Sequence, residues 1–186
     1  MSMSDLLLME LNLMEKIKQQ NMDIIKLLLT ELEHEAITTR KMLALVPADK
    51  FDWAPHEKSM KMQNLATHIA ELPSWVSMAL TTDELDFAAN EYKPAEVSST
   101  ADILDLFEKS YEEGKAELEK ATEENLTGQW ILRSAEQIYA TYTKYETIRH
   151  VFSQTIHHRA QLGVYLRLLN IPIPGSYGPS ADDQNF

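Results

Sequence analysis

Histidines are the residues in this sequence whose type and spacing best suit a catalytic or metal-binding site. Three of the six lie in one run, RHVFSQTIHHRAQL, at positions 150, 157 and 158. Residues four apart in a helix lie one turn apart on nearly the same face, so Gln154 and His158 point to the same side. In a second segment, His68 lies next to Ile69 within an apolar stripe. Each segment therefore places an imidazole at or beside the face that should be buried.

Spacing alone leaves two interpretations of these histidines open. Imidazole nitrogens can share a metal ion when a third ligand comes from a facing helix. A single histidine near an apolar seam is more often a core residue that is hydrogen-bonded to a neighbour. Other kinds of active site lack support, because the sequence has no cysteine, no phosphate-binding loop and no dinucleotide fingerprint.

Four helical segments are expected to position these histidines. The three/four spacing of apolar residues predicts a first helix that ends near residue 46 and a second from about 59 to 80, which Pro73 kinks or breaks. Ser99 and Asp102 form a capping box for a third helix. The fourth, from about 143 to 169, has the clearest apolar seam, and Asn170 ends it. Residues 1–22 form either a separate helical extension or part of the first helix.

The connections between these segments complete the predicted fold. Residues 122–140 have no helical period and contain a short run at 130–132 that suits an extended conformation, as does 138–141. The tail IPIPGSYGPSADDQNF is extended and is expected to lie across the bundle. The sequence therefore predicts an all-α four-helix bundle, residues 1–186 in a single domain, with a long connection between the third and fourth helices and an extended C-terminal tail.

Composition narrows the classes of partner. A chain of 186 residues with 44% hydrophobic and 25% charged residues suits one globular domain. Its formal net charge of −12 repels phosphate backbones and anionic lipid, so neither nucleic acid nor a membrane is an expected partner. No segment reaches the roughly 20 apolar residues that a membrane span needs. Without cysteines or a signal-peptide pattern, a cytoplasmic location is expected.

Three stretches together resemble the DinB-like family. They are THIAELPSW at 67–75, HVFSQTIHHRAQLGVYLR at 150–167 and SYGPSADD at 176–183. The similarity runs from about residue 30 to 183, and the pairing of HHRAQ with the upstream HIAEL is fairly specific. The resemblance implies a helical bundle that is usually a homodimer and that binds a divalent metal, most often zinc or nickel, through three histidines.

The resemblance also assigns the metal ligands, with one departure from the family pattern. The first ligand falls on His68 and the last on His158, whereas the middle position is Gln154. A glutamine offers a neutral carbonyl oxygen, which is a weaker ligand for zinc or nickel than imidazole. His150 is one turn away and could substitute, but it drifts from the face of His158. The implied site is therefore a weakened metal centre or one that has lost its metal.

Two functions follow from the resemblance. In the first, the protein is a metal-dependent transferase or hydrolase, in which the metal lowers the pKa of water or of a low-molecular-weight thiol. In the second, favoured by Gln154, it is a non-catalytic, metal-free bundle that binds a small molecule or serves a stress-associated role. Glu71 could orient His68. Tyr177 could reach the metal-facing pocket or anchor the tail by packing.

Overall fold

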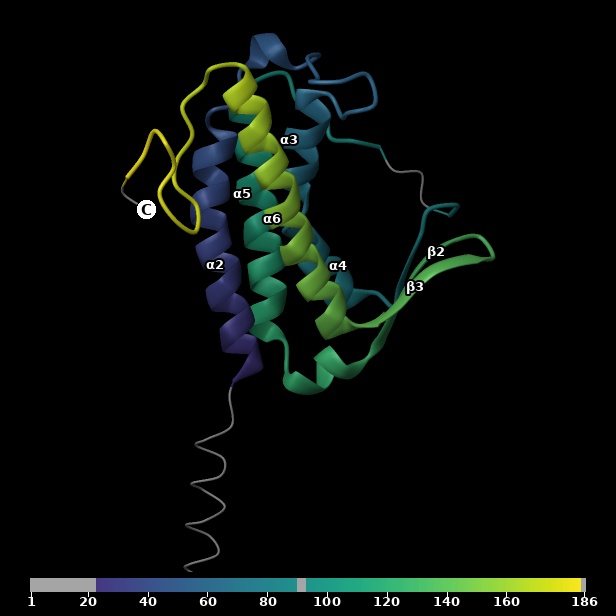
Figure 1. Ribbon diagram of the computed structural model, residues 1–186. Helices are drawn as coiled ribbons and strands as arrows, with labels where there is room; N and C mark the ends of the chain where they lie inside the picture. Colours follow the sequence, from purple (N-terminus) through teal and green to yellow (C-terminus); the bar gives the residue numbers. More distant parts are fainter. Residues whose placement is uncertain (1–22, 90–92, 185–186) are drawn as a thin grey trace, which may run out of the picture.

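The computed structural model describes residues 23–89 and 93–184, which form a helical bundle with a small sheet at one end (Figure 1). The helices are α2 (Ile24–Leu43), α3 (Met62–Glu71), α4 (Ser74–Thr81), α5 (Thr100–Lys120) and α6 (Lys144–Leu168). Two short 3₁₀ helices, η1 (Ala48–Lys50) and η2 (Glu123–Thr127), lie in the connections. Because α3 and α4 together form one rod, the expected four-helix arrangement is present. The helical extension considered for residues 1–22 lies outside the described residues.

Each of the three longest helices begins at a side-chain cap. The Asp23 carboxylate accepts a hydrogen bond from the backbone N–H of Lys26 at 3.0 Å. Ser99 forms the expected capping box with Asp102 at the start of α5, and Thr143 forms one with Glu146 at the start of α6. Such caps satisfy N–H groups that have no partner inside the helix, which fixes where each helix starts.

The α3–α4 rod begins later than its sequence suggests and breaks where expected. It starts at Met62 rather than near residue 59, because the Met62 N–H donates to the carbonyl of Trp53 at 2.8 Å and needs no side-chain cap. Pro73 has no N–H to continue the helix, so α3 ends at Glu71 and α4 starts at Ser74.

A three-stranded sheet shows that the all-α prediction was wrong in this part of the chain. Strands β1 (Glu84–Asp86), β2 (Gln129–Ser134) and β3 (Gln137–Thr143) are ordered β1-β2-β3, with β1 parallel and β3 antiparallel to β2. The extended runs expected near 130 and 138 correspond to β2 and β3. Strand β1 has three residues and pairs with the distant strand β2, so no local sequence pattern predicts it. The β2–β3 hairpin projects away from the bundle (Figure 1).

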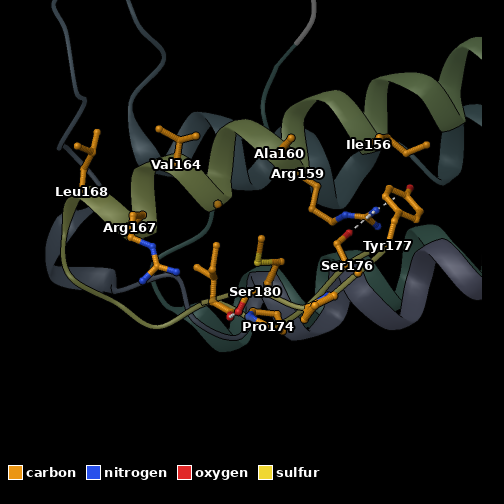
Figure 2. Close-up of a pocket in the computed structure, with 15 residues that line it drawn as sticks. Ile156, Arg159, Ala160, Val164, Arg167, Leu168, Pro174, Ser176, Tyr177 and Ser180 are labelled. Atoms are coloured by element: carbon orange, nitrogen blue, oxygen red, sulfur yellow. Dashed lines mark hydrogen bonds between the residues drawn. The ribbon is translucent and has the colours of Figure 1, made fainter. Parts of the chain in front are cut away.

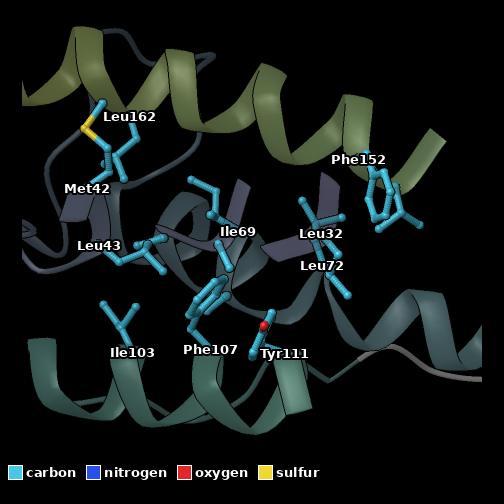
Figure 3. Packing of buried hydrophobic residues seen from close by; sticks show 14 of the residues in the cluster. Leu32, Met42, Leu43, Ile69, Leu72, Ile103, Phe107, Tyr111, Phe152 and Leu162 are labelled. Carbon is cyan, nitrogen blue, oxygen red and sulfur yellow. The ribbon is translucent and has the colours of Figure 1, made fainter. Parts of the chain in front are cut away.

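The core fills the space between the four rods (Figure 3). Helices α5 and α6 each pack against α2 and against the α3–α4 rod. Phe107 of α5 and Phe152 of α6 are almost fully buried. Gly114 of α5 faces the Pro73 break, and a Cβ atom there would lie only 2.2 Å from the Pro73 carbonyl oxygen. Glycine therefore lets α5 approach the break closely.

The C-terminal tail folds back beside α2 and α6, where Figure 1 shows it in yellow. Asn170 adopts a left-handed conformation with φ of 58°, which ends α6 as the sequence predicts. Farther along, Asp182 pairs with Arg167 of α6 and accepts a hydrogen bond from the Ile173 N–H at 3.0 Å. Within residues 23–89 and 93–184, no helix is long and apolar enough to cross a membrane.

Candidate metal centre

The imidazoles of His68 and His158 lie together between α3 and α6. Their ring centroids are 4.7 Å apart and their planes meet at 80°. Both side chains are half-buried. The packing of α3 against α6 brings these two residues together across 90 positions of sequence. Two imidazoles from different helices at this separation can both contact a single metal ion or ligand.

Their surroundings keep both imidazoles neutral near pH 7. Burial lowers the pKa of His68 to about 4, and the nearby His158 ring adds to the effect. Burial also lowers the pKa of His158, although its hydrogen bond to Gln161 opposes the shift. A neutral imidazole carries one nitrogen lone pair, which is the form that binds a metal.

Gln161 determines which nitrogen of His158 is available. The Nδ1 of His158 lies 2.9 Å from the Oε1 of Gln161. Because a carbonyl oxygen only accepts hydrogen bonds, Nδ1 must carry the proton and donate it, which leaves the lone pair on Nε2. Gln161 was not among the residues predicted from the sequence to belong to the site. Its position one turn after a candidate ligand, within the HHRAQ motif, is the signal that identifies it.

Gln154 is half-buried on α6, one turn before His158. Its amide nitrogen lies 3.4 Å from the Nε2 of His150, and the His150 ring stacks on Tyr142 of β3 at 5.8 Å. Glutamine at this position leaves two imidazoles where the family resemblance implies three. Accordingly, the described part of the chain contains no group of three His, Cys, Asp or Glu side chains that could hold a metal.

These donors still fit a divalent cation of intermediate softness. Two neutral imidazoles supply nitrogen ligands, and the carbonyl oxygen of Gln154 is a chemically suitable third donor. Water would complete the coordination. Such a set should bind less tightly than three imidazoles, because an amide oxygen is a weaker ligand than imidazole for zinc or nickel.

Aromatic rings flank the pair on both sides. Trp75 of α4 packs edge-on against His68 with ring centroids 6.1 Å apart, and the exposed His157 lies 4.9 Å from His158. Trp75 follows His68 by seven residues, which is two helical turns interrupted by Pro73. Its position beside His68 could not be predicted from helical spacing, because the helix is broken at Pro73 between the two residues.

Glu71 and Tyr177 bind other partners. The Oε1 of Glu71 accepts a hydrogen bond from the backbone N–H of Ala95 at 3.2 Å. The hydroxyl of Tyr177 donates to Glu35 at 2.7 Å and accepts from Arg159 at 2.9 Å. These contacts favour the anchoring role for Tyr177, because they tie the tail to α2 and α6.

Solved structures share this architecture. A DinB-like protein from Bacillus subtilis, YjoA, aligns with a TM-score of 0.64 at 20% identity, over 80% of this chain and 96% of that one. YfiT from Bacillus subtilis, described as a probable metal-dependent hydrolase with an unusual four-helix bundle topology, has a TM-score of 0.57 at 14% identity, over 80% of this chain and 89% of that one. A mycothiol-dependent maleylpyruvate isomerase has a TM-score of 0.53 at 16% identity, over 75% of this chain and 60% of that one. At these identities the likeness shows the fold alone.

Sequence comparison identifies the family. No curated protein matches this sequence. The model of the DinB family, in contrast, matches residues 15–185, which is nearly the whole chain. The match includes both histidine segments, HIAEL and HHRAQ, and the tail. The chain therefore belongs to the DinB family.

Proposed function

We propose that this protein binds a divalent metal between His68 and His158 and uses it in a hydrolytic or thiol-dependent transfer reaction. The observation that carries the proposal is the convergence of two half-buried imidazoles from different helices, with ring centroids 4.7 Å apart. Two relatives of the same fold support the class of chemistry, since one is described as a probable metal-dependent hydrolase and another as mycothiol-dependent.

In the proposed site each side chain has a separate task. His68 and His158 bind the metal through ring nitrogens, and Gln161 holds the His158 ring with Nε2 unprotonated. Gln154 supplies its carbonyl oxygen as a third ligand. Zinc or nickel suits this combination of two imidazoles and one amide oxygen.

A divalent metal at this position would supply Lewis acidity, which lowers the pKa of a water molecule or a small thiol. Trp75 packs against His68 and would form one wall of the site. His157 is exposed, with its ring 4.9 Å from that of His158, and would be the nearby side chain to take up a proton released at the site. Because the chain has no cysteine, a thiol nucleophile would have to come from a small molecule.

Gln154 favours a second candidate function, in which the bundle has kept its shape but binds no metal. The protein would then be a non-catalytic binding or stress-associated protein. The two candidates differ in one measurable property, the affinity of the purified, tag-free chain for zinc or nickel.

Isothermal titration with Zn²⁺ separates the candidates. The proposal expects one equivalent to bind to the wild type, His158→Ala to abolish binding, and Gln154→His to tighten it by about tenfold or more, equivalent to about 1.4 kcal/mol. His34→Ala is the matched control, because it removes an exposed imidazole from α2. Loss of hydrolytic or thiol-dependent turnover on chelation would then connect the metal with catalysis.

Three outcomes would reject the proposed site. Binding that survives His158→Ala would place the metal elsewhere. A wild type that binds no Zn²⁺ while Gln154→His does would support the metal-free candidate. Absence of binding in both would show that position 154 does not face the histidine pair.

The homodimer that the family resemblance implies stays a prediction. Light scattering coupled to size exclusion should give twice the chain mass of 21.3 kDa. A mass that stays at one chain across the accessible range of concentrations would contradict it.

A further inference from the structure

A groove of about 500 Å³ lies between α6 and the C-terminal tail (Figure 2). Ile156, Ala160 and Val164 line it from α6, and Pro174 and Pro179 line it from the tail. None of the candidate metal ligands contributes to its walls. The lining is therefore mainly apolar and separate from the proposed catalytic site.

Polar anchors hold the tail in place at both ends of the groove. At one end, Arg159 donates to the Tyr177 hydroxyl at 2.9 Å, and that hydroxyl donates to Glu35 at 2.7 Å. At the other end, Arg167 pairs with Asp182. Figure 2 shows Arg159 reaching from α6 towards Ser176 and Tyr177 of the tail. Polar contacts thus fix the tail at both ends, and between these contacts the apolar walls of α6 and the tail stay apart.

The tail is also braced internally, so the groove does not depend on a loose segment. The Ser180 hydroxyl donates to the Ile173 carbonyl at 2.6 Å and accepts from the N–H groups of Asp182 and Asp183. Val164, at the edge of the groove, nevertheless stays 59% exposed. Apolar surfaces in folded proteins are normally close-packed. An ordered tail that leaves an apolar face of α6 uncovered therefore indicates space for a bound ligand.

Size and charge restrict what the occupant can be. Small-molecule sites are usually concave, mainly apolar and roughly 300–1,000 Å³ in volume, and this groove is within that range. Glu35 lies 2.7 Å from the Arg159 guanidinium, and Asp182 neutralises Arg167. The guanidinium groups therefore leave no net positive charge for an anion, and the overall charge of −12 repels anions further.

We propose that this groove binds an uncharged, largely apolar small molecule whose hydrogen-bonding group faces the Arg159–Tyr177 end. A protein partner fits the groove less well. Stable protein interfaces bury about 800 Å² on each partner, whereas this space is bounded by α6 on one side and the tail on the other and has the volume of a small-molecule site. The proposal does not depend on metal binding at His68 and His158.

Fluorescence of the neutral apolar dye N-phenyl-1-naphthylamine tests the proposal on the full-length protein. Wild type should show saturable binding of one dye per chain. Ala160→Phe, which fills the groove from an exposed position on α6, should weaken binding at least tenfold. Ser153→Phe adds the same ring at an exposed α6 position outside the groove and should bind like wild type.

The result would overturn the proposal if wild type shows no saturable binding, or if Ala160→Phe and Ser153→Phe behave alike. Far-UV circular dichroism and a thermal melt establish that both variants are folded. Val164→Asn is a second variant, which should weaken dye binding without changing the melting temperature. Dye binding that disappears as light scattering shows the chain to dimerise would assign the groove to a second copy and reject the small-molecule site.

Discussion

Replacing Gly114 with alanine should destabilise the protein, although helix propensity alone predicts the opposite. In the interior of a helix, alanine is favoured over glycine by about 1 kcal/mol. Here the new Cβ would lie 2.2 Å from the carbonyl oxygen of Pro73 and 3.1 Å from its carbonyl carbon. Both atoms belong to the backbone, so the conflict is relieved only if α5 moves or the break between α3 and α4 changes.

The expected size of the effect follows from these opposing contributions. Forcing extra volume into a packed interior typically costs about 1–3 kcal/mol, and a 2.2 Å contact with backbone belongs at or above the upper end. Subtracting the gain in helix propensity leaves a loss of about 2 kcal/mol in the free energy of unfolding. For a chain of this size the melting temperature should fall by roughly 4–8 °C.

Urea denaturation followed by circular dichroism measures the change, with Gly163→Ala as the matched control. A Cβ at position 163 of α6 would meet the end of the flexible Met42 side chain at 3.0 Å. That side chain can move aside, so the control should stay within about 1 kcal/mol of wild type. If Gly114→Ala proved as stable as wild type or more so, the close approach of α5 to the Pro73 break would be refuted.

Three further predictions concern the tail, the hairpin and the start of α6. In an ultraviolet absorbance titration, Tyr177→Phe should remove one tyrosine with a raised pKa: desolvation of the hydroxyl, then its hydrogen bond to Glu35, raises the pKa of Tyr177 to about 12, although the residue as a whole is 66% exposed. Because the folded state holds this proton more tightly, its contribution to stability is complete below pH 10 and is lost as the pH rises to 12; an unchanged titration in the variant would contradict this. Ala135→Gly should raise the free energy of unfolding by about 0.5–1 kcal/mol, because Ala135 has φ of 48°, and a lower midpoint in urea would argue against strain there. Thr143→Ala removes the cap that accepts from the Glu146 N–H at 3.1 Å and should cost about 1 kcal/mol in the same assay, whereas Thr143→Ser should retain most of it.

Features that depend on neighbouring residues could be predicted from the sequence. The capping box of Ser99 and Asp102 involves residues three apart, and the break at Pro73 follows from the missing N–H of a single residue. The start of α3 was misplaced because its cap is the carbonyl of Trp53, which belongs to the preceding loop. Strand β1 was missed for the same kind of reason, since its partner Ile131 is 47 positions from Glu84.

In the candidate site, too, features set by neighbouring residues could be predicted, whereas features set by distant residues could not. Helical periodicity placed His68 and His158 on inward faces, and the structure brings their rings together. The deep burial of Arg159, which is 2% exposed, could not be anticipated, because its carboxylate partner Glu35 lies 124 positions away in another helix. Long-range ion pairs of this kind leave no periodic signal in the sequence.

The most direct test of the histidine pair is a nuclear magnetic resonance titration of the imidazole nitrogens with Zn²⁺. In histidine-labelled protein, one equivalent of Zn²⁺ should shift the resonances of the unprotonated ring nitrogens of His68 and His158 together, while those of His34 and His56 stay unchanged. Before the metal is added, the Nδ1 of His158 should carry the proton that it donates to Gln161. A pair that stays unchanged at saturating Zn²⁺, or a shift confined to other histidines, would contradict the proposed metal centre.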